Sequence, residues 1–510
     1  MPRLQNPSRA LAVVVALAAV TAGCGLKPDA TESLKSANNG GGSGVSGGTG
    51  GSSPGTTAGV PGGPGVTGGA PVGAPGATGG GAAAGTGGQA TTTAGGGTPG
   101  GSAQAAAGNV ACGTPHGGST TGITAGTINI GLHAPLTGTG TPFPNSSFQK
   151  GAGTFWAQPG HTVCGRKVTV EFQDDQYTPA HARQVCSAMA QRDFMVVGGG
   201  GTDQIQACAT EPTIHEKNVP YISAGVTDNG LTGLSNYFAI SLTYKQQGTL
   251  VLRNAQTQGF ASPAASNQPS DNIKGQNAKW AIVTANTPNF YGARDGMEAA
   301  LNAAHIPYKD FSKQVNQNGN YQAAATQFGQ TLAQEGFKTI YVDAAPGWFV
   351  FMTGGYYSVP TAQADWVGPG VTYTEVTVAQ YICSGSKNAI NGHAWFLAPA
   401  PALDHATADF RKAYNNSYDD IEWALWGLSN TLWNLLKDAS DNLTRQNFIS
   451  STEGQTVPSN PYVPVDFRDH GGHFGGTGAW VQRVNCATTE PDQNQAGGWD
   501  TVGNAYLRLF

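Results

Sequence analysis

From residue 127 onward, short apolar runs alternate with longer stretches of mixed polarity. The run at 128–132 and the alternating segment KVTVEF at 167–172 have the length and pattern of strands. Residues 147–156 and 180–191 have the pattern of helices. Strands that alternate with helices predict parallel sheets, so we expect this part of the chain to fold as an α/β protein.

The stretch from 194 to 228 combines two predicted strands with small and hydroxyl residues at their ends. FMVV at 194–197 precedes four glycines, and Thr202 and Asp203 are suited to cap the helix that follows. A second strand, VPYI at 219–222, leads into Ser-Ala-Gly-Val-Thr. Ligands of open α/β sheets bind at the carboxyl ends of the strands. This stretch is therefore expected to form half of a ligand cleft.

A second series of elements follows a polar insert at 261–276. It begins with a strand at 280–283, a loop at 285–292 and a helix through residue 304. Two such series predict two α/β lobes, with the ligand site in the cleft between them. The Trp-rich helix near the end is expected to pack in a core rather than to hold a cofactor. The other predicted strands are 237–240, 339–342, 364–368 and 394–397, and the other helices are 246–256, 321–335, 348–357, 404–415 and 422–438.

The N-terminus has the features of an export signal. Arg3 and Arg9 precede an apolar run at 10–20, which is too short for a permanent membrane span, and small residues follow it. The ending Thr-Ala-Gly-Cys resembles the bacterial lipobox, in which the cysteine is lipidated. We predict a signal peptide at 1–23 and a lipid anchor on Cys24 that holds the protein outside the cell membrane. The alternative is a soluble secreted protein with an incidental cysteine.

Residues 24–110 are predicted to be a disordered tether, because from about residue 38 they are almost wholly Gly, Ala, Thr, Ser and Pro. Such tracts cannot bury enough apolar surface to offset the entropy of ordering. Spacing is the expected role, and contact with a cell wall is the alternative. Charged residues are 11% of the chain and the net charge is −5. Without a basic stripe, nucleic acid is not expected as a partner.

Three motifs suggest other chemistry but lack its remaining parts. The glycines at 198–201 are not followed by the Gly-Lys-Ser/Thr of a phosphate-binding loop. Ser384 and Lys387 have the spacing of some acyl-transfer enzymes, without the companion motifs. His470 and His473 could hold a metal, but glycines separate them. We therefore predict no enzyme, no cofactor and no metal.

The order of these pieces resembles the type I periplasmic binding proteins, specifically the branched-chain amino acid receptors of ABC transporters. The resemblance rests on the Pro-Leu-Thr-Gly loop after the first strand, on Gln-Asp-Asp at 173–175, on Val-Pro-Tyr-Ile-Ser-Ala at 219–224 and on Asn-Phe-Tyr-Gly at 289–292. It implies two Rossmann-like lobes joined by three hinge crossings. Lobe 1 is then expected at 126–245 and 393–470, and lobe 2 at 246–392 and 471–510.

The resemblance also implies a function and part of a site. The function is an extracytoplasmic receptor, expected as a monomer, that captures a small solute and delivers it to an ABC permease. A sensor on the same fold, without transport, is the alternative. The implied ligand contacts are Thr202, Gly225 and Thr227 in lobe 1 and Tyr291 in lobe 2.

The family's acidic residue for a ligand ammonium has no direct match here, and Glu375 is the nearest substitute. Trp348 and Phe143 are expected to add aromatic walls to the cleft. A cleft with aromatic walls and few charges suits an amino acid, an amide or another small solute with an apolar portion.

Six cysteines besides Cys24 in an exported chain predict a disulfide framework. The resemblance favours a bridge between Cys186 and Cys208, on consecutive predicted helices. Other pairings stay open, as does a zinc site, although the chain has no Cys-x-x-Cys. The set that we prefer adds Cys112 with Cys164 and Cys383 with Cys486.

Overall fold

The computed structural model describes most of the chain from residue 113 onward. The predicted signal peptide, Cys24 and the tether lie outside the described residues, and so do Cys112, Phe143, Gly225 and His470. The described ranges are 113–137, 145–224, 227–259, 280–317, 320–370, 373–458, 461–468, 473–491 and 493–509.

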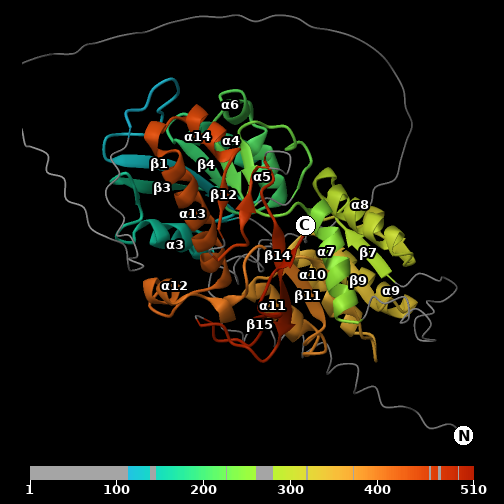
Figure 1. The fold of residues 1–510 in the computed structure, drawn as a ribbon. Coiled ribbons are helices and arrows are strands. Elements are labelled where there is room, and N and C mark those ends of the chain that lie inside the picture. The colour runs from blue at the N-terminus through green and yellow to red at the C-terminus, as the bar shows by residue number, and fades with distance from the viewer. Residues whose placement is uncertain are drawn as a thin grey trace, which may run out of the picture. The chain divides into compact units, whose positions relative to one another are not determined.

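Two sheets organise the described chain, and the first has six strands in the order β2-β3-β1-β4-β5-β6 (Figure 1). Its strands are β1 (Thr127–Ala134), β2 (Thr162–Val163), β3 (Arg166–Asp174), β4 (Met195–Gly198), β5 (Tyr221–Ser223) and β6 (Tyr237–Ala239). All neighbours are parallel except β2 and β3. The chain leaves β1 for β3 on one side and returns to β4 on the other. Such a reversal opens a crevice at the carboxyl ends of the strands.

The helices of lobe 1 come from both ends of the folded region. They are α3 (Asn145–Trp156), α4 (Pro179–Met189), α5 (Thr202–Ala209), α6 (Pro212–His215), α13 (Asp420–Asp438) and α14 (Arg445–Thr452). Helix α13 packs on α3, far from it in sequence (Figure 1). Its Trp423 and Trp426 are buried, and Trp426 meets Phe155 edge to face at 5.0 Å. The predicted core role of this Trp-rich helix is confirmed.

The second sheet runs in the order β15-β14-β11-β10-β9-β7-β8. Its strands are β7 (Trp280–Thr284), β8 (Tyr308–Asp310), β9 (Thr339–Asp343), β10 (Asp365–Pro369), β11 (Ala394–Ala398), β14 (Gly478–Asn485) and β15 (Gly498–Thr501), and β16 (Leu507–Arg508) pairs with β14. From β11 to β8 all neighbours are parallel, whereas β14 and β15 are antiparallel additions. The predicted parallel α/β fold class is thus confirmed in both sheets.

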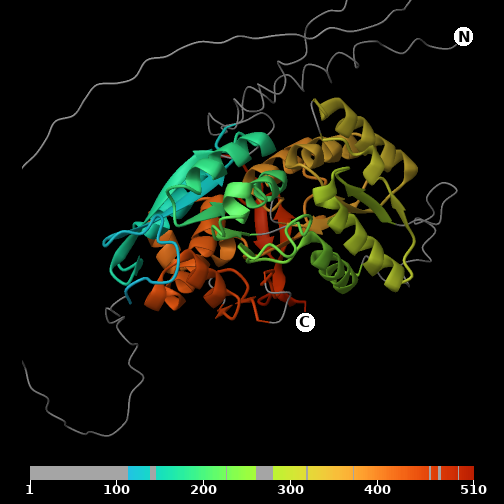
Figure 2. The same ribbon diagram turned by 90° about the horizontal axis from the view of Figure 1, so that it is seen from above.

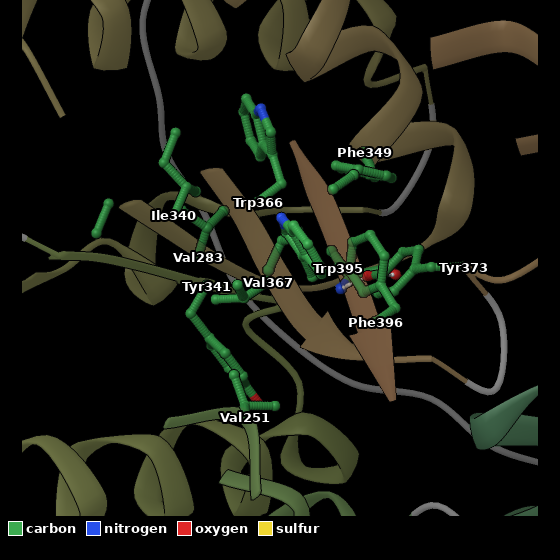
Figure 3. Close-up of a cluster of buried hydrophobic side chains, with 14 of the residues drawn as sticks. Val251, Val283, Ile340, Tyr341, Phe349, Trp366, Val367, Tyr373, Trp395 and Phe396 are labelled. Atoms are coloured by element: carbon green, nitrogen blue, oxygen red, sulfur yellow. Dashed lines mark hydrogen bonds between the residues drawn. The ribbon is translucent and has the colours of Figure 1, made fainter. Parts of the chain in front are cut away.

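Lobe 2 is completed by α7 (Tyr244–Thr257), α8 (Pro288–Ala303), α9 (Gln322–Glu335), α10 (Pro346–Tyr357) and α11 (Val376–Gly385). Helices α7 and α8 pack side by side (Figure 2). Aromatic side chains fill the core between helices and sheet (Figure 3). Phe349 lies 5.7 Å from Trp366 and 5.4 Å from Phe396, ring centre to ring centre. Tilted and edge-to-face contacts of this kind stabilise a core beyond the area that they bury.

The chain passes between the two sheets at 241–243, at 399–402 and near 475–477. The first and third crossings touch at Gly476. A Cβ at this position would lie 2.2 Å from the backbone carbon of Ser241, so only glycine allows the two crossings to lie so close. The remaining short elements are η5 (Ser312–Gln314), η6 (Leu403–His405), α12 (Ala408–Ala413), η7 (Ser440–Asn442), β12 (Thr456–Val457) and β13 (Val465–Asp466).

The two lobe boundaries that we predicted in the C-terminal half, at residues 393 and 471, differ from those in the structure. Residues 393–470 were assigned to lobe 1, but β11 pairs with β10 inside the second sheet. The chain therefore crosses to lobe 1 after β11 and not before it. Residues from 471 were assigned to lobe 2, but Phe474 still bridges to Ala239 of the first sheet. An apolar run shows that a strand exists. Which sheet receives it depends on pairing partners that lie far away in sequence.

Two predicted elements also differ in extent. Helix α8 begins at Pro288, so residues 289–292 form its first turn instead of a loop. Proline is well tolerated at the first position of a helix, where its missing N–H is not needed. The predicted helix at 404–415 is divided into η6 and α12.

Two disulfides cross-link the described part of the chain. Cys186 of α4 is bonded to Cys208 of α5, as predicted, and Cys383 of α11 to Cys486, which follows β14. Cys164 is also disulfide-bonded, and its predicted partner Cys112 lies outside the described residues. His133 is near the first bridge, but a disulfide offers no thiolates, which argues against the zinc alternative there. None of the described helices is long and apolar enough to cross a membrane.

Candidate functional site

A cavity of about 100 Å³ lies where the strand ends of both sheets meet. Gly199 and Ala224, directly after β4 and β5, line it from lobe 1. Thr374 and Glu375, between β10 and α11, line it from lobe 2. Residues 398–403, which include the crossing at 399–402, and the first turns of α13 form further parts of the wall. The space holds several water molecules or a small organic group.

Aromatic and aliphatic side chains form much of this wall. Phe148 comes from α3, Trp423 and Leu428 from α13, and Trp499 from β15. The Trp423 Nε1 donates to the backbone oxygen of Pro401 at 2.9 Å, and the Trp499 Nε1 donates to that of Glu375 at 3.0 Å. Because both indole N–H groups are satisfied by backbone, the rings offer the cavity apolar surface.

Three carboxyl side chains line the same cavity: Glu375, Asp420 and Glu490. Glu375 is 8% exposed, and its Oε2 has no hydrogen-bond partner. Burial raises the pKa of Glu375 well above its usual range, the nearby Asp420 and Asp419 raise it further, and Thr377 partly opposes the shift. The site therefore concentrates acidic groups that are largely shielded from bulk solvent.

Asp420 is the first residue of α13 and bridges to a second helix. Its Oδ2 accepts the N–H of Val376, the first residue of α11, at 3.1 Å. Its Oδ1 is buried and has no partner. Burial raises the pKa of Asp420 well above its usual range, and so do Asp419 and Glu490.

Thr202, predicted as a ligand contact, instead joins two elements. It is the first residue of α5, and the helix cap is Gly201, whose φ of 81° suits glycine. The Thr202 hydroxyl lies 2.9 Å from that of Tyr244, at the start of α7, and the Thr202 side chain is buried. It does not line the cavity.

A second link between the lobes centres on Asn289, in the first turn of α8. The side-chain amide of Asn289 donates to Asp203 Oδ1 of α5 at 2.5 Å. Its Oδ1 accepts the amide N–H of Asn229, which follows β5, at 2.8 Å. The Asn289 side chain of lobe 2 thus forms hydrogen bonds with the segments of lobe 1 that follow β4 and β5.

The other predicted ligand contacts that the structure describes each have different neighbours. The Thr227 hydroxyl accepts the N–H of Asn229 at 3.1 Å. Tyr291 bonds to Asn286 within lobe 2, and the Arg294 guanidinium lies 4.8 Å from its ring centre. Trp348 is 1% exposed, so it packs in the lobe 2 core and is not a cleft wall. Gly225 and Phe143 lie outside the described residues, although Ala224, beside Gly225, lines the cavity.

Of the predicted set, Glu375 alone among the described residues lines this cavity. Asp420, Phe148 and Trp423 were not predicted as ligand contacts. Phe148 and Trp423 lie in segments that were interpreted only as helices, and Asp420 lies just before the predicted helix at 422–438. Nothing in the local pattern shows that α3 and α13 meet at the strand ends.

Comparison with known proteins decides the family. Residues 127–491 match the family described as periplasmic binding protein. The chain belongs to this family. Its two α/β lobes agree with the type I fold that the sequence motifs implied. A search of curated proteins finds no match.

Several solved structures share the fold at low identity. A fatty acid ABC transporter substrate-binding protein from Thermomonospora curvata has a TM-score of 0.60 and 15% identity, over 76% of this chain and 94% of that one. A solute-binding protein from Rhodopseudomonas palustris in complex with 3,4-dihydroxy benzoic acid has a TM-score of 0.59 and 15% identity, over 75% and 98%. The branched-chain amino acid binding protein LivJ from Streptococcus pneumoniae, in complex with isoleucine, has a TM-score of 0.52 and 15% identity, over 74% and 100%.

Proposed function

We propose that this periplasmic binding protein is an extracytoplasmic solute receptor that captures a small molecule between its lobes and delivers it to an ABC permease. The observation that carries the proposal is the cavity itself, which is lined by strand ends of both sheets and by one of the crossings between them. A ligand that touches both lobes favours their closed arrangement, because only there are both sets of contacts made.

Other features support the same role. Two of the structural relatives named above are described as binding proteins of ABC transporters, one for fatty acids and one in complex with 3,4-dihydroxy benzoic acid. The third is described as the substrate-binding protein of a branched-chain amino acid transporter, in complex with isoleucine. We further propose that a lipid on Cys24 anchors the receptor as a monomer, and that residues 24–110 give it reach from the membrane.

The site residues divide into two groups under this proposal. Glu375 is the predicted ligand contact that the cavity supports. Thr202, Gly225, Thr227, Tyr291 and Phe143 stay predictions as ligand contacts.

Native mass spectrometry of freshly purified protein tests the function. We expect an added mass of a small solute, lost on denaturation, or its capture from a mixture of metabolites. Small-angle scattering of the protein with and without the solute should show a decrease in the radius of gyration on binding. A protein that retains and captures no solute, or that converts one to product, would contradict the proposal.

A further inference from the structure

The turn that follows β5 carries the dipeptide Asn229-Gly230 and lies against the first turns of α8. Both residues of the dipeptide are exposed. The N–H of Leu231 closes the turn by donating to the backbone oxygen of Asp228 at 3.3 Å. A Cβ on Gly292 of α8 would lie 2.9 Å from the Asp228 carboxylate. This exposed turn of lobe 1 is therefore in close contact with lobe 2.

An asparagine followed by a glycine is open to a specific spontaneous reaction. Asparagine is a thermolabile residue, and a glycine after it has no Cβ to obstruct the attack of its backbone nitrogen. That nitrogen bonds to the asparagine Cγ, the Cγ–Nδ2 bond breaks, and the displaced amide group leaves with the backbone proton as ammonia. Water then opens the five-membered succinimide to aspartate or isoaspartate. The reaction needs no oxidant and no reductant.

The chain has four Asn–Gly pairs, and the structure describes two of them. At the second, the Asn391 Oδ1 accepts the N–H of Cys486 at 2.8 Å, and the N–H of Gly392 donates to the backbone oxygen of Val484 at 3.1 Å. Reaction there would break both bonds. Within the described part of the chain, no hydrogen bond holds the N–H of Gly230. The nitrogen that attacks is therefore restrained at one pair and available at the other.

The side-chain amide of Asn229 is held by lobe 2. Its Nδ2 donates to Oδ1 of Asn289, the buried side chain that also donates to Asp203. Deamidation would place a carboxylate oxygen, an acceptor, against the Asn289 oxygen. The new group is ionised at neutral pH, and the first turns of α8 already face the carboxyl groups of Asp203 and Asp228. The contact would thus lose a hydrogen bond and gain repulsion.

We propose that Asn229 is a site of spontaneous deamidation, and that its conversion to aspartate or isoaspartate weakens the contact between the two lobes. Separation of the lobes frees the amide for attack, so the reaction is faster in the open state. The product in turn favours that state. The inference about closure rests on the proposed receptor function, and the inference about the modified residue does not.

Peptide mapping of the full chain, incubated at pH 8, tests the site. Deamidation replaces an amide by a carboxyl group and adds about 1 Da. We expect this gain to accumulate at Asn229 at least about tenfold faster than at Asn391, where two hydrogen bonds must break. Equal rates at the two positions, or no gain at Asn229, would overturn the inference.

Variants test the restraint by lobe 2. Asn289→Ala removes the acceptor that holds the amide, so deamidation at Asn229 should become about two- to tenfold faster. Asn302→Ala, at an exposed position of the same helix, is the matched control and should keep the parental rate. Asn229→Gln keeps an amide but requires a six-membered ring, so it should show no gain over the same period. A parental rate in Asn289→Ala would overturn the link to lobe closure.

The effect on closure is measured with small-angle scattering of the unliganded chain. Asn229→Asp carries the charge of the product, and we expect it to have a larger radius of gyration than the parent. Asn391→Asp makes the same change of charge and keeps an acceptor for the N–H of Cys486, so it should scatter as the parent does. An unchanged radius in Asn229→Asp would overturn the proposed effect on the lobes.

The outcomes separate this inference from the receptor function. A chain that deamidates at Asn229 but retains and captures no solute would refute the receptor function and leave the modification site standing. A chain that binds a solute but gains no mass at Asn229 would refute the inference alone.

Discussion

At the scale of single residues, Arg445 and Asp193 show how lobe 1 tolerates buried charge. The Arg445 guanidinium, on α14, donates to the backbone oxygens of Phe194 at 3.0 Å and of Ala190 at 2.8 Å, and also to that of Asp193. Burial lowers the pKa of Arg445 to about 10, which leaves it charged at neutral pH. The side chain therefore replaces lost hydration by hydrogen bonds to the end of α4 and the start of β4.

The carboxyl group of Asp193 is less well compensated. It is 2% exposed, and its Oδ2 has no partner. Burial and the nearby Glu171 raise the pKa of Asp193 to about 6, while Arg192 and Arg445 act in the opposite direction. In the unfolded chain an aspartate titrates near about 3.9. The folded state thus binds the proton more tightly, and the stabilisation from this group is complete below pH of about 4 and is lost as pH rises through about 6.

We predict that Asp193→Asn raises the free energy of unfolding at pH 7.5 by roughly 1 to 3 kcal/mol, since a shift of about two units corresponds to about 2.7 kcal/mol. Urea unfolding at pH 4, 6 and 7.5 checks this. The variant should differ little from the parent at pH 4. Asp295→Asn, at a half-exposed position paired with Arg294, is the control. A stability gain that is equal at all three pH values would contradict the assignment.

At the scale of elements, the two disulfides restrain different kinds of neighbours. The Cys186–Cys208 bridge joins consecutive helices over 22 residues of sequence. The Cys383–Cys486 bridge spans 103 residues and joins α11 to the end of β14. A cross-link reduces the entropy of the unfolded chain, and this effect grows with the length of the closed loop.

We therefore predict unequal losses when each bridge is removed by a pair of Cys→Ala changes. In the chain-entropy picture, loss of Cys186–Cys208 costs about 3 kcal/mol and loss of Cys383–Cys486 about 5 kcal/mol. Denaturant unfolding of the two double variants under identical conditions measures the difference. Equal losses, or a larger loss for the shorter loop, would show that strain or local packing outweighs loop entropy here.

At the scale of the whole folded region, polar side-chain contacts link the two lobes. Asn289 provides two of them, to Asp203 and Asn229, and the hydroxyl groups of Thr202 and Tyr244 form another. Burial raises the pKa of Asp203, and the hydrogen bond from Asn289 partly opposes the shift. Under the proposed function, separation of the lobes would break these contacts, so they add to the ligand's own contacts in the closed state.

We predict that Asn289→Ala weakens solute binding by about five- to thirtyfold, which corresponds to the loss of roughly 1 to 2 kcal/mol from the closed state. Calorimetric titration with the solute found by mass spectrometry measures the change. Asn302→Ala, at an exposed position of the same helix, should bind as the parent does. Parental affinity in the Asn289 variant would mean that these bonds do not help to close the lobes.

Anchoring also belongs to this scale. If Cys24 carries the lipid, Cys24→Ala should move the protein from the membrane fraction to the soluble fraction, because acyl chains supply the membrane affinity. Fractionation followed by immunoblotting checks the distribution. A variant that stays with the membrane would exclude lipidation at this residue as the anchor.

The sequence by itself determined the fold class, most of the elements and the family. The hydrophobic pattern is a local property, so the alternating segment at 167–172 and the continuous apolar run at 194–197 were sufficient to predict strands β3 and β4. The prediction of the Cys186–Cys208 bridge needed only two consecutive helices and the family resemblance. Glu375 was identified through the family resemblance, as the nearest substitute for the acidic residue that takes a ligand ammonium.

The tertiary structure alone decided which distant segments meet. Asp420 joins Glu375 at the cavity because α13 packs on α3 and its first residue reaches the N–H of Val376. No local pattern carries that information, since the two carboxyls belong to different elements and meet only through long-range packing. The same reason explains β11, whose apolar run fits either sheet until its pairing with β10 is known. It also explains Trp348, whose place in a core or on a cleft wall depends on neighbours from other helices.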